Sequence, residues 1–85
     1  MTAIQYDLSK WSSQRWIRDS RYYDIHVHQD LWGHWITTRV NGRLQTALGR
    51  VVHHPSANYQ SAQNIAALLG TRRVQRNYDE VLHDD

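Results

Sequence analysis

The sequence lacks cysteine and phenylalanine altogether, and its 85 residues include one proline and one methionine. Without cysteine the chain forms no disulfide bond, no thiolate nucleophile and no cysteine-ligated zinc site. Without phenylalanine, its aromatic residues are four Trp and five Tyr. These rings carry a polar group and suit interfaces that contact water, although most of them are expected to fill the core.

Long apolar runs are also missing. No stretch approaches the roughly 18 apolar residues that a membrane-spanning helix needs. The first residues lack the basic and apolar regions of a signal peptide and read MTAIQYDLSKW. We therefore expect a cytoplasmic protein without a membrane segment, and its length corresponds to one small domain.

The net charge of +2 is distributed unevenly along the chain. Residues 1–14 are neutral, residues 15–76 hold nine Arg against three Asp, and residues 79–85 carry four acidic side chains. Arginine binds phosphate through two parallel hydrogen bonds and stacks on flat rings. The basic middle segment therefore favours a partner that carries phosphate.

Alternating apolar and polar residues predict a strand at residues 21–28. Tyr23, Ile25 and Val27 point to one side of this strand, and the polar residues between them point to the other. Residues 29–34 contain Asp and Gly and are expected to form a turn.

Aromatic and β-branched residues predict a second strand at 35–40. The dipeptide Asn41-Gly42 is typical of a tight hairpin turn, or it shapes a longer loop through residues 43–49. A third strand is expected at 50–54, where Pro55 ends it.

After Pro55 the apolar residues recur at the spacing of a helix. Ser56 or Ser61 is expected to cap this helix, and Gly70 either ends the helix or weakens it. Residues 78–82 are expected to return as a short edge strand. The apolar stripe of the helix consists of Ala62, Ile65, Ala66 and Leu69.

These elements together predict an α+β fold, a small antiparallel sheet with one helix packed on it. Residues 1–20 are expected to form an N-terminal arm or an edge strand. Residues 21–81 form the domain, and residues 82–85 form an acidic tail.

Arginines near aromatic residues suggest a nucleic-acid surface, because phosphate needs cations and bases or sugars need exposed rings. One cluster lies just before and at the start of the first strand and consists of Arg15, Trp16, Arg18 and Arg21. Three arginines close the helix, where cations also suit the helix dipole. The predicted phosphate contacts are Arg39, Arg43, Arg50, Arg72, Arg73 and Arg76. A solvated surface with scattered ion pairs is the structural alternative.

Histidines offer a possible metal site. His26 and His28 share a strand face, and His53-His54 lie on another predicted strand. Imidazoles two residues apart can chelate zinc or copper, but a dedicated site usually adds Cys, Asp or Glu at defined spacing. Hydrogen-bonded or solvent-facing histidines are the preferred interpretation, so we expect no metal and no cofactor.

Catalytic motifs are absent from the sequence: it contains no nucleophile elbow, HExxH, P-loop or GxGxxG. It has a single Glu, and four of its eight acidic residues lie at 79–85. Paired carboxylates for acid–base chemistry are not expected. The sequence therefore indicates a protein that is not an enzyme.

The order of features over residues 21–81 resembles the WGR domain. These features are RYYDIHVHQDLWGHWITTRVNGR, then LGRVVHHP, a helix and RRVQRNYDEV. The resemblance implies a small antiparallel sheet with one helix. It also implies DNA binding, since WGR domains bind DNA breaks in poly(ADP-ribose) polymerases. Others occur as short stand-alone bacterial proteins.

The motif that names the family is changed here. Asn41 stands where the family has Trp, whereas Gly42 and Arg43 match. In DNA-binding members the Trp stacks on a sugar at a strand end, and the Arg contacts the backbone nearby. The resemblance therefore adds Asn41 and Gly42 to the predicted DNA site, with a phosphate contact at Arg43 but no stacking ring at Asn41.

Two other roles stay open. The chain could be a protein-interaction module, an adaptor or inhibitor that docks on a larger protein or nucleoprotein complex, because Trp and Arg are frequent interface hot spots. It could also form a homodimer through its Trp and His residues or through an edge strand. The predicted partner-binding residues are Arg15, Trp16, Arg18 and Trp32.

Overall fold

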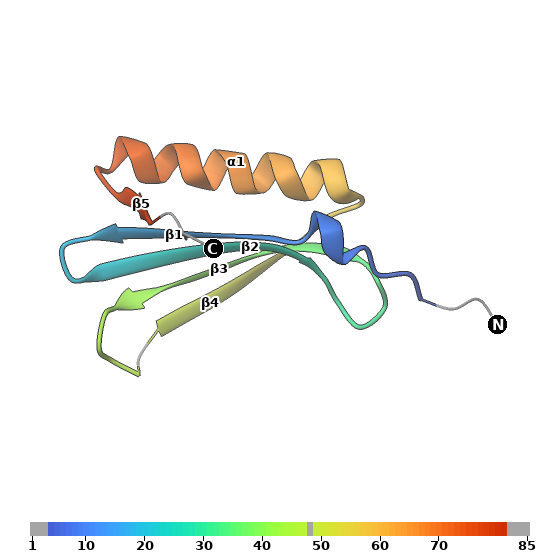
Figure 1. Ribbon diagram of the computed structural model, residues 1–85, viewed down its shortest axis with the longest axis horizontal. Helices are drawn as coiled ribbons and strands as arrows, with labels where there is room; N and C mark the ends of the chain where they lie inside the picture. The colour runs from blue at the N-terminus through green and yellow to red at the C-terminus, as the bar shows by residue number, and fades with distance from the viewer. Residues whose placement is uncertain (1–3, 48, 82–85) are drawn as a thin grey trace.

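A computed structural model describes residues 4–47 and 49–81 of the chain. The elements in chain order are the 3-10 helix η1 (Leu8–Lys10), strands β1 (Ser12–Arg18), β2 (Arg21–Gln29), β3 (Trp35–Arg43) and β4 (Gly49–Pro55), helix α1 (Tyr59–Gln75) and strand β5 (Asp79–Val81). The strands form one antiparallel sheet in the order β4-β3-β2-β1-β5. Helix α1 lies across one face of this sheet (Figure 1). The predicted α+β fold is therefore confirmed.

Strand β1 lies inside the sheet. It pairs with β2 from Ser12 opposite Val27 to Arg18 opposite Arg21. The segment 1–20, expected to form an arm or an edge strand, thus contains an internal strand, because β5 returns after the helix and pairs with its outer side. The acidic tail at 82–85 lies outside the described residues.

The sheet face under α1 carries the core. Tyr23, Ile25 and Val27 of β2 are all buried, as the alternation of the sequence predicted. The hydroxyl of Thr37 on β3 donates a hydrogen bond of 2.7 Å to the carbonyl of Ala62 and so ties the helix to the sheet. The other buried apolar side chains are Trp16, Ala62, Ala66 and Leu69.

The helix begins one residue after Asn58, whose side chain accepts a 2.8 Å hydrogen bond from the Ser61 amide. The prediction of Ser56 or Ser61 as the cap is wrong. Ser61 already lies in the first turn, where its backbone amide needs a cap rather than supplies one.

Gly70 lies inside the helix and does not end it, since α1 continues to Gln75. A Cβ on Gly70 would lie 3.3 Å from the Gln14 side chain and 3.6 Å from the Trp16 ring. The glycine therefore lets the helix approach β1 closely, and this contact outweighs its poor helix propensity.

Asn41 and Gly42 lie within β3, so the prediction of a hairpin turn at this dipeptide is wrong. They pair with Tyr23 and Tyr22 of β2 and continue the ladder to Arg43 opposite Arg21. The chain turns later, between the end of β3 at Arg43 and the start of β4 at Gly49, which agrees with the alternative of a longer loop through residues 43–49. Gln45 in this connection adopts a left-handed φ of 64°. The full length of β2 provides a partner for β3, and this pairing overrides the local turn preference.

No helix in the described ranges 4–47 and 49–81 is long and apolar enough to cross a membrane.

Candidate functional site

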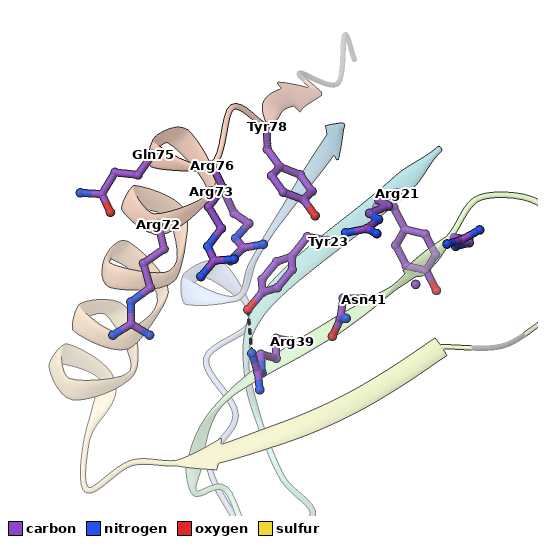
Figure 2. Close-up of a pocket in the computed structure, with 12 residues that line it drawn as sticks. Arg21, Tyr23, Arg39, Asn41, Arg72, Arg73, Gln75, Arg76 and Tyr78 are labelled. Carbon is purple, nitrogen blue, oxygen red and sulfur yellow. Dashed lines mark hydrogen bonds between the residues drawn. The ribbon is translucent and has the colours of Figure 1, made fainter. Parts of the chain in front are cut away.

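A cleft opens between the C-terminal end of α1 and the ends of β2 and β3, with a cavity volume of about 660 Å³. Figure 2 shows side chains from the helix and from the sheet pointing into it. The residues that line the cleft are Arg21, Tyr22, Tyr23, Arg39, Asn41, Gly42, Arg43, Arg72, Arg73, Gln75, Arg76 and Tyr78.

The cleft is strongly basic. Six of its lining residues are arginines and none is acidic. Within residues 4–47 and 49–81, the ion pairs are Lys10–Asp7, Arg15–Asp24 and His34–Asp30, and all of them lie outside the cleft. The six arginine charges therefore have no carboxylate partner in the described part of the chain, and the cleft presents a positive field to solvent.

The end of α1 determines where two of the lining side chains lie. Asn77 has a left-handed φ of 64°, its amide bonds the Val74 carbonyl, and the Tyr78 amide bonds the Arg73 carbonyl. This hydrogen-bond pattern is a Schellman motif, which reverses the chain after a helix. The reversal brings Tyr78 back beside Arg73 at the cleft.

Arg73 is stacked on two tyrosines. Its guanidinium carbon lies 4.0 Å from the ring centre of Tyr23 and 4.8 Å from that of Tyr78. Such cation–π contacts hold the guanidinium flat against the rings. Its Nε is buried and has no hydrogen-bond partner among the described residues.

Arg39 reaches the same tyrosine from the sheet. Its Nη1 donates a hydrogen bond of 3.3 Å to the Tyr23 hydroxyl (Figure 2). Its Nε, like that of Arg73, is buried without a partner in the described part of the chain. Buried donors are nearly always satisfied in folded proteins, so Arg39 and Arg73 each carry a donor that the described residues leave unsatisfied.

Three arginines lie side by side across the sheet. Arg21 is opposite Arg18 on β1 and opposite Arg43 on β3. Like charges at directly opposite positions destabilise a sheet by up to about 1 kcal/mol per pair. An anion held between them would remove this repulsion, which is the physical reason to regard the row as part of a binding surface.

The structure gathers seven of the eight predicted nucleic-acid residues at one cleft. The exception is Arg50, which lies exposed on β4 opposite Asn41, next to the cleft rather than on its wall. Arg21, whose cluster the sequence did indicate, also lines the cleft. Residues that the prediction missed are Tyr22, Tyr23, Gln75 and Tyr78.

The predicted partner-binding residues do not form one surface. Trp16 is 7% exposed and belongs to the core, so its ring is not available to a partner. Arg15 pairs with Asp24 through two hydrogen bonds, which raise the pKa of Arg15. Arg18 donates to the Arg76 carbonyl at the end of the helix. Trp32, in contrast, is 69% exposed.

Three of the four sheet histidines bond to hydroxyls, whereas the Nε2 of the fourth, His54 on β4, is buried without a hydrogen-bond partner in the described part of the chain. Thr38 Oγ1 lies 2.6 Å from His28 Nε2 and 2.8 Å from His53 Nδ1, and Ser13 Oγ lies 2.8 Å from His26 Nδ1. No group of three or more His, Cys, Asp or Glu residues suited to a metal ion occurs in residues 4–47 and 49–81. His26, His28 and His53 therefore have structural partners on the sheet face away from α1.

Comparisons of this chain with known protein families, with characterised proteins and with solved structures found no match.

Proposed function

We propose that the protein is a non-catalytic nucleic-acid-binding protein, and that the arginine cleft holds the phosphate backbone. The observation that carries this proposal is the set of six cleft arginines without a carboxylate partner in the described part of the chain. Arginine donates two parallel hydrogen bonds to phosphate, and its guanidinium group is always charged.

The spread of the arginines favours a chain of phosphates over a single small anion. They come from β2, β3 and the C-terminal end of α1, around a cavity of about 660 Å³. Arg50 extends the basic surface onto β4, because it lies opposite the cleft residue Asn41. A polymer with regularly spaced phosphates can contact all of these positions together.

DNA is the proposed polymer because of the resemblance to WGR domains. Asn41, Gly42 and Arg43, the residues of the changed motif, all line the cleft, which is where the resemblance would require them. Asn41 has no ring, but Tyr78 is a half-buried tyrosine on the cleft wall. Its ring, which carries the Arg73 guanidinium at 4.8 Å, is the proposed contact for a sugar or base.

The test is a titration of the protein with fluorescent single-stranded, duplex and nicked DNA and with RNA of matched length, at two salt concentrations. We expect micromolar or tighter binding that weakens with salt. The slope of log K against log salt should be about −0.9 for each duplex phosphate contacted. No binding to any of the four at low salt would contradict the proposal.

Two variants locate the site. Arg43→Ala removes an exposed cleft cation and should weaken binding about tenfold while reducing the salt slope by about one. Lys10→Ala is the control, because it removes the same charge from the η1 helix outside the cleft. Equal effects of the two variants would mean that the cleft is not the site.

A second candidate function, docking on another protein, is supported by one observation. Leu31 and Trp32 are 77% and 69% exposed on the turn between β2 and β3. Neither residue lines the arginine cleft. A protein partner at this turn would leave the nucleic-acid site free.

A further inference from the structure

The end of the sheet opposite the arginine cleft is apolar. The β2–β3 turn lies at one end of the sheet and the C-terminal end of α1 at the other (Figure 1). A cavity of about 710 Å³ lies beside this turn. Its lining residues are Tyr6, Leu8, Trp11, His28, Gln29, Asp30, Leu31, Trp32, Ile36 and His53.

The turn that presents Leu31 and Trp32 is rigid. Asp30 Oδ1 accepts hydrogen bonds of 2.9 Å from the amides of Trp32 and His34. The Asp30 amide bonds the His34 carbonyl, and the Gly33 amide bonds the Asp30 carbonyl. The two large side chains are thus held in solvent by a turn that needs no further ordering before it binds.

The N-terminal segment supports the turn from the side. The Tyr6 hydroxyl donates a 2.7 Å hydrogen bond to the Leu31 carbonyl. The buried Gln29 side chain accepts from the Asp7 amide and from Trp11 Nε1, and it donates to the carbonyls of Gln5 and Gly33. These bonds fix the cavity wall and the exposed turn in one relative position.

Nucleic acid and anionic lipid do not fit this surface. The cavity has no Lys or Arg among its lining residues, whereas phosphate backbones and anionic headgroups require cations. Its one carboxylate, Asp30, is already bonded within the turn. The occupant must therefore be apolar and close to neutral.

A second copy of this chain meets these requirements. Each copy carries a projecting pair, Leu31 and Trp32, and an open apolar cavity on the same surface. Two copies related by a two-fold axis can each place the pair in the cavity of the other. We propose that this apolar end is the interface of a homodimer formed by reciprocal insertion of the Leu31–Trp32 turn.

The charge distribution favours this orientation. Two copies repel each other through their arginine clefts, and this repulsion is weakest when the clefts are farthest apart. Contact through the apolar ends places the clefts at the two outer ends of the dimer and leaves both open.

The exposed apolar area is sufficient for a weak dimer. Leu8, Leu31 and Trp32 are 66%, 77% and 69% exposed, and Tyr6 and Trp11 are 46% and 39% exposed. At ~150–250 Å² for a fully exposed aromatic ring, these side chains offer roughly 500 Å² per copy. Two copies would bury roughly 1,000 Å², the lower limit of specific interfaces. We therefore expect a dimer with a dissociation constant in the micromolar range.

Sedimentation velocity of the full chain across a range of about 5 to 500 µM tests the proposal. The parent protein should shift from monomer to dimer over this range. Leu31→Ser and Trp32→Ser should each raise the dissociation constant about tenfold or more. Leu68→Ser is the matched control, because Leu68 is 53% exposed on α1, outside the apolar cavity, and it should leave the dimer intact.

Thermal unfolding of each variant shows whether it folds, and either turn variant alone is sufficient for the comparison. A parent protein that stays monomeric to the highest concentration would overturn the proposal. A dimer that both turn variants retain, or that Leu68→Ser also loses, would overturn it as well. DNA affinity is expected to be unchanged in all three variants, so this test is independent of the proposed function.

Discussion

The guanidinium of Arg73 lies over the ring of Tyr23 at 4.0 Å, and the hydroxyl of the same tyrosine accepts a hydrogen bond from Arg39. Tyr23 is 3% exposed and is part of the core. One core residue therefore positions two cleft arginines, one through the face of its ring and one through its hydroxyl. The geometry of the proposed binding site follows from the packing of the sheet against the helix.

Tyr23→Phe separates these two contacts. The variant keeps the ring under Arg73 but removes the acceptor for Arg39, so we expect a loss of about 0.5–1.5 kcal/mol in the free energy of unfolding. DNA affinity should fall several-fold because Arg39 loses its anchor. Tyr59→Phe is the control, since the Tyr59 hydroxyl bonds Gln63 at the start of the helix, outside the cleft. Urea unfolding and DNA titration measure both effects, and equal DNA affinities for the two variants would contradict this role of Tyr23.

Gln29→Leu tests the support of the apolar end. The substitution removes the group that holds residues 5–11 against the turn, so we expect a loss of about 2–3 kcal/mol in the free energy of unfolding. Cleavage by protease within residues 5–11 should become faster in the native state. Gln60→Leu is the control, because the Gln60 side chain is exposed and bonds Asn64 on the surface of α1. An unchanged cleavage rate for Gln29→Leu would show that other contacts hold the segment.

Local patterns in the sequence were sufficient to predict the helix and the core of β2, β3, β4 and β5, but not the internal strand β1. Tyr23, Ile25 and Val27 repeat every second residue, and Ala62 and Ala66 lie one helical turn apart, so each buried face could be identified without knowledge of the partner element. The basic residues at the end of β3 and at the end of α1 could likewise be named. Their meeting in one cleft depends on how the helix crosses the sheet, which no local pattern encodes.

The register between β2 and β3 explains why the sequence did not predict that Tyr23 lies at the cleft. A turn at Asn41-Gly42 would have placed Arg43 on the following strand, away from Arg21. Instead β3 continues, Arg43 pairs with Arg21, and Asn41 pairs with Tyr23. A strand register is set by long-range pairing and by the preceding turn, so Tyr23 could be assigned to the core but not to the cleft.

Acid should destabilise the protein through His28. Burial lowers the pKa of His28 below its ordinary value of 6.5, and the neighbouring His26 and His53 lower it further, against the opposing effects of the Gln29 amide and Asp30. As the pH falls through about 6.5, the unfolded chain takes up this proton before the folded chain does. The contribution of neutral His28 to the free energy of unfolding is fully present above that pH. It is lost as the pH falls through the lowered pKa. Urea unfolding at about pH 7.5, 6.5 and 5.5 should show this decline in the free energy of unfolding. The variant His28→Gln should show a shallower decline. An equally steep decline in the variant would assign the effect to other groups.

Asn41→Trp tests the resemblance to WGR domains directly. Asn41 is half-buried on the cleft wall, opposite Tyr23 on one side and Arg50 on the other. A ring at this position would face the proposed path of the DNA. Stacking contributes about 1–3 kcal/mol, which corresponds to roughly 5- to 150-fold tighter binding.

We expect the gain from Asn41→Trp to be larger for nicked DNA than for continuous duplex, because a strand end exposes a sugar on which the ring can stack. Asn41→Leu is the matched control, since it fills the same space with an apolar group that has no flat face. Titration of both variants with nicked and continuous duplex DNA makes the comparison. If both substitutions weaken binding to the same extent, the ligand itself occupies the space beside Asn41, and the cleft binds nucleic acid in a way that WGR domains do not.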